Sequence, residues 1–331
     1  MEAYNKKDFV SGQDPRWCPG CGDYAILSSV QTALTKIGKK KEDIVFVSGI
    51  GCSSRLPYYV DTFGLHTIHG RAPGLASGLK IHNPNLSVWI ITGDGDSLSI
   101  GGNHLIHLLR RNMDVNVLLF NNEIYGLTKG QYSPTSKPGT ISKSSPDGSL
   151  DRSFNPASLA LGAGATFFAR TIDTDPMHMI AIFVAAEKHR GTSLVEIYQN
   201  CLIFNEGTHD LYTKKDTRDD NSVRVEHGKP LIFGKEKNKG IIRNNFRPVV
   251  ANFGENNVTE RDAIIYDSTD IHTAQMVGTM KPPQFPVALG VLYQVAEPTY
   301  DQQVNNQLEE LRQKHGEGIC SSCSVLVIPG K

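Results

Sequence analysis

The sequence lacks any apolar run near the roughly 18 to 20 residues that a helix needs to cross a bilayer. Its first residues, MEAYNKKDFVSGQDPRW, also lack the apolar centre of a secretory signal. Neither charge is in excess, because 34 Lys and Arg face 34 Asp and Glu. A chain with no net charge has no long-range field to attract nucleic acid or an anionic membrane. We therefore expect a cytoplasmic protein that binds neither.

The rest of the composition is typical of a globular protein: 331 residues, of which 39% are hydrophobic and 21% are charged. Glycine and cysteine stand out, with 31 and 6 residues. Structural disulfides are rare in a reducing compartment, so we interpret the cysteines as metal-binding or redox-active groups.

Strand and helix patterns alternate through the first two thirds of the chain. Nearly continuous apolar runs predict strands at 44–48, 87–92, 115–120 and 193–198, with predicted helices at 24–38, 72–82, 102–112, 155–163 and 176–190. This alternation predicts an α/β fold, a mainly parallel sheet covered by helices on both faces. The Ser-, Pro- and Gly-rich segment 133–153 is long for a loop in such a fold, and is expected to be functional or disordered.

We assign residues 1–204 to the α/β core and residues 205–331 to a C-terminal extension. Within the extension, the pattern predicts a hairpin at 229–243 and a terminal helix at 301–315. We expect the extension to dock on a partner subunit and to cover part of the site.

Two polar motifs follow apolar strands and indicate a site for phosphate and metal. Gly93-Asp94-Gly95-Asp96 follows one strand, and Asn121-Asn122 follows the next. The carboxyl ends of parallel strands meet at one edge of the sheet, where ligands bind. Glycines allow the backbone to approach a phosphate closely, and Asp and Asn supply the oxygen ligands that suit Mg²⁺. Gly-Asp-Gly by itself is also consistent with a simple turn.

Together the two motifs resemble the thiamine diphosphate motif, in which Asn-Asn follows Gly-Asp-Gly at a spacing close to the one found here. The resemblance implies that Mg²⁺ is held against the diphosphate by the Asp94 carboxylate, the Asn122 side chain and the Ile124 carbonyl.

Four cysteines fall at predicted strand ends or helix starts: Cys18 and Cys21 before the first helix, Cys52 after the first strand, and Cys201 after the last. Four thiolates can hold an iron–sulfur cluster or a structural zinc, and the spacing favours neither. Free core thiols are a third interpretation.

A second Cys-x-x-Cys pair, Cys320 and Cys323, lies in a polar tail. We expect these two residues to be surface thiols or groups specific to the tail, and not cluster ligands.

The motifs occur in the order found in one known family: CPGCG from Cys18, GIGCSS around Cys52, HGRA from His69, GDGD from Gly93, NNEIYGLTKGQ from Asn121, and Cys201. Over about residues 10–205 the chain resembles the β subunit of 2-oxoacid:ferredoxin oxidoreductases. The resemblance implies a [4Fe–4S] cluster on Cys18, Cys21, Cys52 and Cys201, close to thiamine diphosphate. It also implies these cofactor-binding residues: Ile50, Gly51, Cys52, Ser53, His69, Gly93, Asp94, Gly95, Asp96, Asn122, Ile124, Tyr125, Gly126 and Leu127.

The family's activity is the oxidative decarboxylation of a 2-oxoacid, with electrons passed to ferredoxin and the acyl group to coenzyme A. The resemblance therefore implies these partners. It also implies an α subunit that carries the aminopyrimidine-binding domain, because this chain contains only one α/β core. We expect the isolated chain to be inactive.

Three side chains are candidates for catalysis and substrate binding. His69 would contact the diphosphate or hold a proton near it, although a structural histidine is the alternative. Arg55 and Lys129 follow the loops of Cys52 and Asn122, and would bind a substrate carboxylate. Each is also consistent with a surface cation. The motifs around them resemble the 2-oxoglutarate branch of the family, so we prefer that substrate to pyruvate.

Two other functions compete with this interpretation. The first is a thiamine-dependent decarboxylase or synthase without redox chemistry, which has no use for four cysteines at the ligand edge. The second is a zinc-binding scaffold protein with an incidental glycine-rich loop.

Overall fold

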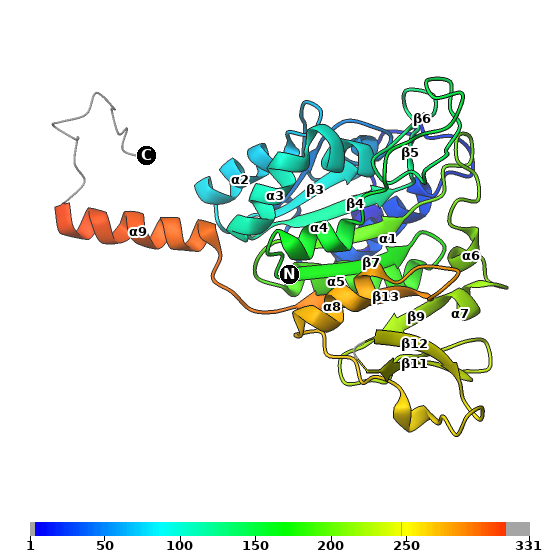
Figure 1. Cartoon of the computed structure of the whole chain (residues 1–331). Coiled ribbons are helices and arrows are strands. Elements are labelled where there is room, and N and C mark those ends of the chain that lie inside the picture. The colour runs from blue at the N-terminus through cyan, green and yellow to red at the C-terminus, as the bar shows by residue number, and fades with distance from the viewer. Residues whose placement is uncertain (1–3, 246, 316–331) are drawn as a thin grey trace.

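An eight-stranded sheet runs through the computed structural model, which describes residues 4–245 and 247–315 (Figure 1). In spatial order its strands are β2 (Phe63–His66), β1 (Ile44–Ser48), β3 (Ser87–Gly93), β4 (Asn116–Asn121), β8 (Ser193–Tyr198), β7 (Phe167–Ile172), β13 (Val287–Gln294) and β9 (Ser222–Val225). All neighbouring pairs are parallel except β13 and β7. The predicted mainly parallel α/β fold is confirmed.

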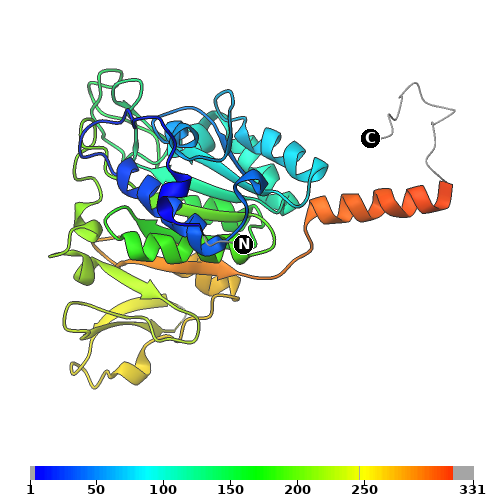
Figure 2. The same ribbon diagram turned by 180° about the vertical axis from the view of Figure 1, so that it is seen from behind.

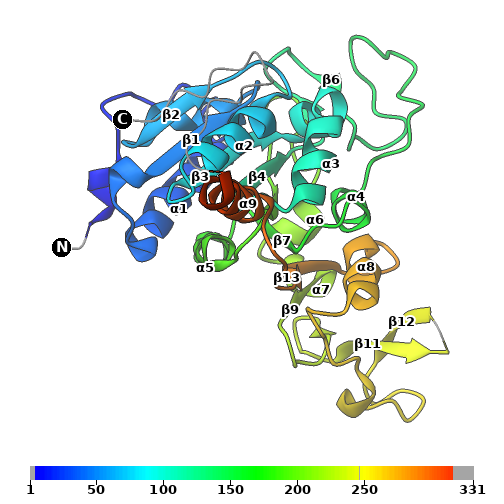
Figure 3. The ribbon, with the colours of Figure 1, turned by 90° about the vertical axis from the view of Figure 1, so that its left-hand side faces the viewer.

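Helices cover both faces of the sheet, as the side view in Figure 3 shows. One face packs against α1 (Asp23–Ile37) and α5 (Pro176–Lys188), and the other against α2 (Ala72–His82), α3 (Gly102–Arg111), α4 (Pro156–Gly162) and α8 (Ile271–Thr279). Because both faces are covered, β1, β4 and β7 are buried at every position. Each predicted helix and strand is present, with ends within two residues of the prediction.

The sequence analysis missed four strands of this sheet, β2, β7, β9 and β13. A charged residue interrupts the apolar run of β7, because Arg170 lies buried in it and pairs with Glu196 on β8. The edge strand β2 is exposed along its whole length, so it carries no core pattern. A buried charge in a core strand and an exposed edge strand both lack the apolar pattern from which strands are predicted.

Residues after 204 contribute to the same sheet and also form smaller units. They include α6 (Asp210–Thr213), α7 (Arg218–Asn221), and a small antiparallel sheet of β10 (Ile232–Phe233), β11 (Lys239–Asn244) and β12 (Arg247–Asn252). The pairing of β10 with β11 confirms the predicted hairpin. The strands β13 and β9 extend the core sheet beyond β7. The division of the chain at residue 204 stays a prediction.

The predicted terminal helix is α9 (Tyr300–His315), which projects from the body of the protein (Figures 1 and 2). Cys320 and Cys323 lie outside the described residues. Of the helices in the described ranges, none combines the length and the apolar character needed to cross a membrane.

Candidate functional site

A pocket opens at the carboxyl ends of β1, β3 and β4. Every residue named above as cofactor-binding lines it, from the loop at Ile50 to the hairpin at Leu127. That hairpin is formed by β5 (Ile124–Tyr125) and β6 (Gln131–Tyr132). The pocket also includes Asp23, Phe120, Thr128 and Gln199, which the sequence analysis did not identify. The edge of the parallel sheet thus gathers the motifs as predicted.

Asp94, which directly follows β3, is 2% exposed and faces this pocket. Its Oδ2 accepts hydrogen bonds from the hydroxyls of Ser133 and Thr135, each at 2.5 Å. Burial raises the pKa of the Asp94 carboxyl to about 6, against the lowering effect of these two donors. A buried carboxylate is stabilised by a bound cation, so the donor chemistry here fits Mg²⁺.

Asn122 and Ile124 complete the predicted set of oxygen donors in the same pocket. The Asn122 Oδ1 accepts the backbone N–H of Ile124 at 3.2 Å, and its Nδ2 donates to Oε1 of Gln199 at 2.9 Å. Glu123 between them has a left-handed backbone, with φ at 56°. This turn brings the side chain of Asn122 and the backbone of Ile124 to the same wall of the pocket.

Glycine is required at two positions near this pocket, because another side chain lies too close to the backbone to leave room for a Cβ. A Cβ at Gly95 would lie 2.2 Å from the ring of Tyr125, whose hydroxyl donates to the Gly95 carbonyl. A Cβ at Gly49 would lie 1.8 Å from Oδ2 of Asp96. Both contacts are far inside van der Waals distance, so a side chain at either position would displace the loops that line the pocket.

Asp96 holds His69 and the loop after β1 in place. Its Oδ1 lies 2.6 Å from Nδ1 of His69 and accepts the backbone N–H groups of Ile50 and Gly70. Asp96 begins a π-helical turn that ends at Ile100, a feature common at functional sites. The Nδ1 contact orients the His69 ring, which lines the pocket. His66 instead bonds to Ser48 and does not line it.

The four described cysteines line a second pocket, with a volume of about 200 Å³, and all carry free thiols. Trp17 fixes the loop of Cys52, because its indole N–H donates to the Cys52 carbonyl at 2.7 Å. A Cβ at Gly126 would lie 3.4 Å from Sγ of Cys201 and 3.8 Å from Sγ of Cys52. Glycine therefore keeps space open beside the thiols.

The thiol pocket disfavours free thiolates. Burial, followed by the nearby Asp23 carboxylate, raises the pKa of the Cys52 thiol to about 11. Burial also raises the pKa of Cys21 and of Cys201. Bound metal stabilises thiolates, so this donor set fits a metal group. In the described ranges, no three His, Cys, Asp or Glu side chains converge on one ion. In a [4Fe–4S] cluster each cysteine binds a different iron, so the four thiols need to line one cavity and not to converge on one ion.

Arg55 and Lys129 line the thiol pocket, and neither lines the first pocket, which contains Asp94. The Arg55 guanidinium donates to the carbonyl of Arg16 at 2.8 Å. The two pockets are neighbours, because six residues line both: Asp23, Cys52, Asn122, Gly126, Leu127 and Gln199. The structure thus brings both cations to the thiol pocket and not to its neighbour.

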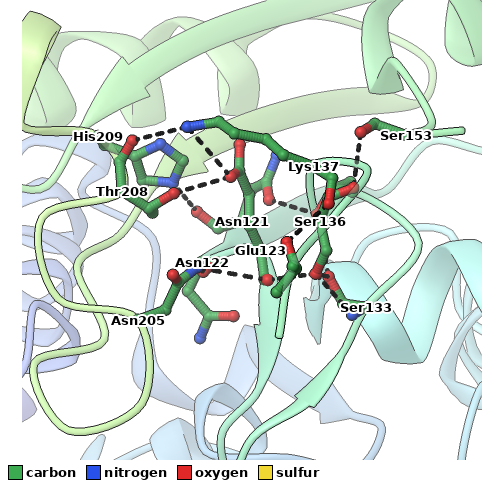
Figure 4. A network of polar contacts seen from close by, with 12 residues as sticks. Asn121, Asn122, Glu123, Ser133, Ser136, Lys137, Ser153, Asn205, Thr208 and His209 are labelled. Carbon is green, nitrogen blue, oxygen red and sulfur yellow. Dashed lines mark hydrogen bonds and ion pairs between the residues drawn. The ribbon is translucent and has the colours of Figure 1, made fainter. Parts of the chain in front are cut away.

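A polar network behind the pocket fixes the Asn121–Glu123 turn (Figure 4). The Asn205 side chain donates to the Asn122 carbonyl at 2.9 Å, and Thr208 donates to the Glu123 carboxylate at 2.8 Å. Ser136 donates to the Glu123 carbonyl. The long Ser-rich segment is therefore ordered where it passes the site. Its Ser-Pro-Thr-Ser run of short hydroxyl side chains was the available sequence signal for this role.

The fold and the pocket define the diphosphate-binding domain of a thiamine-dependent enzyme. Residues 49–197 match the family described as thiamine pyrophosphate enzyme, C-terminal TPP binding domain. The chain is 47% identical over 323 residues to 2-oxoglutarate oxidoreductase subunit KorB of Mycobacterium tuberculosis. The aligned region covers 97% of this chain and 86% of the relative. It belongs to the β subunits of the 2-oxoacid:ferredoxin oxidoreductases.

Two further comparisons agree with this assignment. The chain is 44% identical to 2-oxoacid:ferredoxin oxidoreductase 1, subunit beta, of Aeropyrum pernix, over 61% of this chain and 63% of that one. A solved 2-oxoglutarate:ferredoxin oxidoreductase from Magnetococcus marinus, with 2-oxoglutarate, coenzyme A and succinyl-CoA bound, superposes with a TM-score of 0.76. That match has 32% identity and covers 97% of this chain and 94% of the other.

Proposed function

We propose that this chain is the β subunit of a cytoplasmic 2-oxoglutarate:ferredoxin oxidoreductase, which converts the 2-oxoacid and coenzyme A to an acyl-coenzyme A and CO₂ and passes two electrons to ferredoxin. The observation that carries the proposal is the shared wall between two pockets, one lined by Asp94 and Asn122 and the other by four cysteines. A thiamine enzyme without redox chemistry has no need of the second pocket. The names of the Mycobacterium relative and the Magnetococcus structure support 2-oxoglutarate as the substrate.

In this proposal, thiamine diphosphate would supply the carbanion chemistry of decarboxylation when bound, and a [4Fe–4S] cluster would supply the one-electron redox chemistry. Asp94, the Asn122 side chain and the Ile124 carbonyl would hold Mg²⁺. The backbone around Gly51 and Gly95 would bind the diphosphate. His69, oriented by Asp96, contacts the diphosphate or holds a proton near it.

Cys18, Cys21, Cys52 and Cys201 are the proposed cluster ligands. Their common cavity, and the burial that raises the pKa of the Cys21, Cys52 and Cys201 thiols, support this assignment. Cys18 is the exposed member of the set, which gives electrons a short route to ferredoxin at the surface.

Arg55 and Lys129 are the proposed partners of the 2-oxoglutarate carboxylates, since both line the thiol pocket, which adjoins the pocket of Asp94 and Asn122. Replacement of Arg55 by alanine should raise the KM for 2-oxoglutarate more than the KM for pyruvate. Equal effects on the two substrates would contradict the assignment.

The proposed α subunit completes the site and binds the aminopyrimidine. An apolar surface beside the pocket supports such an interface: the side chains of Phe63, Ile68 and Ile100 are 62%, 76% and 53% exposed. We also propose that residues 205–331 dock on this partner. Deletion of 256–331 without loss of assembly would count against that role.

The deciding experiment is anaerobic co-expression with the partner subunit, followed by metal analysis, EPR and turnover. The proposal requires a brown complex with about four irons per β chain and 2-oxoglutarate-dependent reduction of ferredoxin. A colourless complex that binds thiamine diphosphate would indicate the non-redox enzyme. Stoichiometric zinc without turnover would indicate the scaffold. The isolated β chain should show no turnover.

A further inference from the structure

We propose that Gln199 is a positioning residue that links the two cofactor sites through one side-chain amide, orienting Asn122 for Mg²⁺ and donating to the sulfur of Cys21. This inference rests on the proposed function, because it assigns Asn122 to the metal and Cys21 to the cluster.

Gln199 directly follows β8, where its backbone N–H donates to the Asn121 carbonyl at 3.0 Å. The residue is 1% exposed and lines both pockets. Its position in the wall between them is therefore fixed by the sheet itself and by close packing around the side chain.

The hydrogen bonds of the Gln199 amide can be counted completely. The Nε2 donates to the Asn200 carbonyl at 2.6 Å and to Sγ of Cys21 at 3.2 Å, which uses both of its hydrogens. The Oε1 accepts the Nδ2 of Asn122 at 2.9 Å. A flipped amide would place Nε2 against another donor and Oε1 against a carbonyl, so only one orientation satisfies all three partners.

That orientation determines which atom Asn122 presents to the cofactor. Its Nδ2 is held by Gln199, so its Oδ1 is turned to the side of the Ile124 N–H and keeps a second lone pair. Only the oxygen of an amide can bind Mg²⁺. Without the Gln199 oxygen, Asn122 could rotate and direct its NH₂ group at the cation. Outer partners of this kind typically change metal affinity 10- to 100-fold.

The other end of the amide acts on sulfur. An N–H that donates to a metal-bound thiolate stabilises negative charge, and it therefore favours the reduced form of a cluster. Loss of the bond should make the reduction potential of the cluster more negative. One residue would thus set both the metal affinity at the diphosphate and the driving force for electron transfer.

The test compares Gln199→Met with the wild-type complex, co-expressed with the partner subunit and prepared anaerobically. Methionine is close to glutamine in volume but removes the amide. Thiamine diphosphate affinity is measured by calorimetry at stepped Mg²⁺ concentrations, and the cluster potential by EPR-monitored redox titration. We expect the Mg²⁺ requirement to rise by about 10-fold or more and the potential to become more negative.

The matched control is Gln31→Met. Gln31 is also buried and also donates to a carbonyl, that of Tyr59 at 3.0 Å, but it lines neither pocket. It should leave both readouts unchanged. Gln199→Leu replaces the methionine variant if that variant does not assemble.

The outcomes separate this inference from the function on which it rests. A wild-type complex without a cluster signal or without Mg²⁺-dependent cofactor binding would overturn the proposed function. A normal wild type with a Gln199 variant that changes only one readout, or neither, would overturn the linking role alone.

Discussion

The hydroxyl of Thr135 lies 2.5 Å from Oδ2 of Asp94, although 41 residues separate them in sequence. The same hydroxyl lies 2.9 Å from Oδ1 of Asn121, so Thr135 connects the ends of β3 and β4 behind the proposed Mg²⁺ site. Both Thr135 and Ser133 contact Oδ2 of Asp94. This leaves Oδ1 as the oxygen that can face the cation, and it makes the Ser-rich segment part of the site.

We expect Thr135→Val to weaken Mg²⁺-dependent binding of thiamine diphosphate by about 10- to 100-fold, because the carboxylate loses an orienting donor. Thr135→Ser keeps the hydroxyl and should bind nearly as the wild type does. Calorimetry on the assembled complex measures both. Ser144→Ala, at an exposed position of the same segment, is the control. Equal affinities for the valine and serine variants would contradict the role.

Gly126→Ala should lower the iron content of the complex without unfolding it. The added Cβ meets the sulfurs of Cys201 and Cys52 at ordinary contact distance, so the protein tolerates it, but it occupies space beside the thiols. Iron analysis and visible absorbance measure the effect. The control is Gly102→Ala on α3, where a Cβ meets nothing within 4 Å. Full iron content in the Gly126 variant would show that the cluster does not use this space.

Glu196→Gln should cost about 3 to 5 kcal/mol of unfolding free energy, measured by denaturant titration. Glu196 is fully buried, and its two oxygens accept the Arg170 Nε at 2.7 Å and the Asn121 Nδ2 at 2.8 Å. The variant leaves the Arg170 charge uncompensated. Its new NH₂ group would also face a donor, either the Arg170 Nε–H or the Asn121 Nδ2 group. The double replacement Arg170→Met with Glu196→Leu should cost less than the single change, since it removes the buried charge.

Stability should fall in mild acid through His178. Burial, and then the positive charge of Arg224, lower the pKa of His178 to about 4 in the folded protein. The unfolded chain binds a proton near pH 6.5, so the contribution of this residue is complete above that pH and is lost as the pH falls towards 4. Between pH 7.5 and pH 5 it amounts to about 2 kcal/mol.

His178→Gln should therefore lose less stability than the wild type over the same range, as measured by urea unfolding at both values. An identical loss in the two proteins would assign the acid sensitivity to other groups.

The sequence was sufficient to predict those parts of the site that are written in local motifs. A few neighbouring residues are enough to recognise the Gly-Asp-Gly, Asn-Asn and cysteine motifs and the chemistry they suit. The ends of parallel strands then bring these motifs to one edge of the sheet. Gln199 could not be predicted in this way. Its partners Cys21 and Asn122 lie 178 and 77 residues away, and a single glutamine has no pattern of its own.

One of the strands missed from the sequence, β7, has a related cause. β7 was hidden by Arg170, whose charge is satisfied by Glu196 on a neighbouring strand, a pairing that exists only in the folded sheet. Burial of a charge depends on such a partner, and partners distant in sequence are invisible to periodicity.

The position of β13 has a consequence for the order of events on the ribosome. β7 ends at Ile172 and lies between β8 and β13 in the sheet. β13 ends only at Gln294, so it is synthesised after the loops that line both pockets. A nascent chain of that intermediate length presents β7 as an open edge, which can pair with other chains. Until β13 has been synthesised, β7 therefore lacks one of its two partner strands, although the loops that line both pockets are already complete.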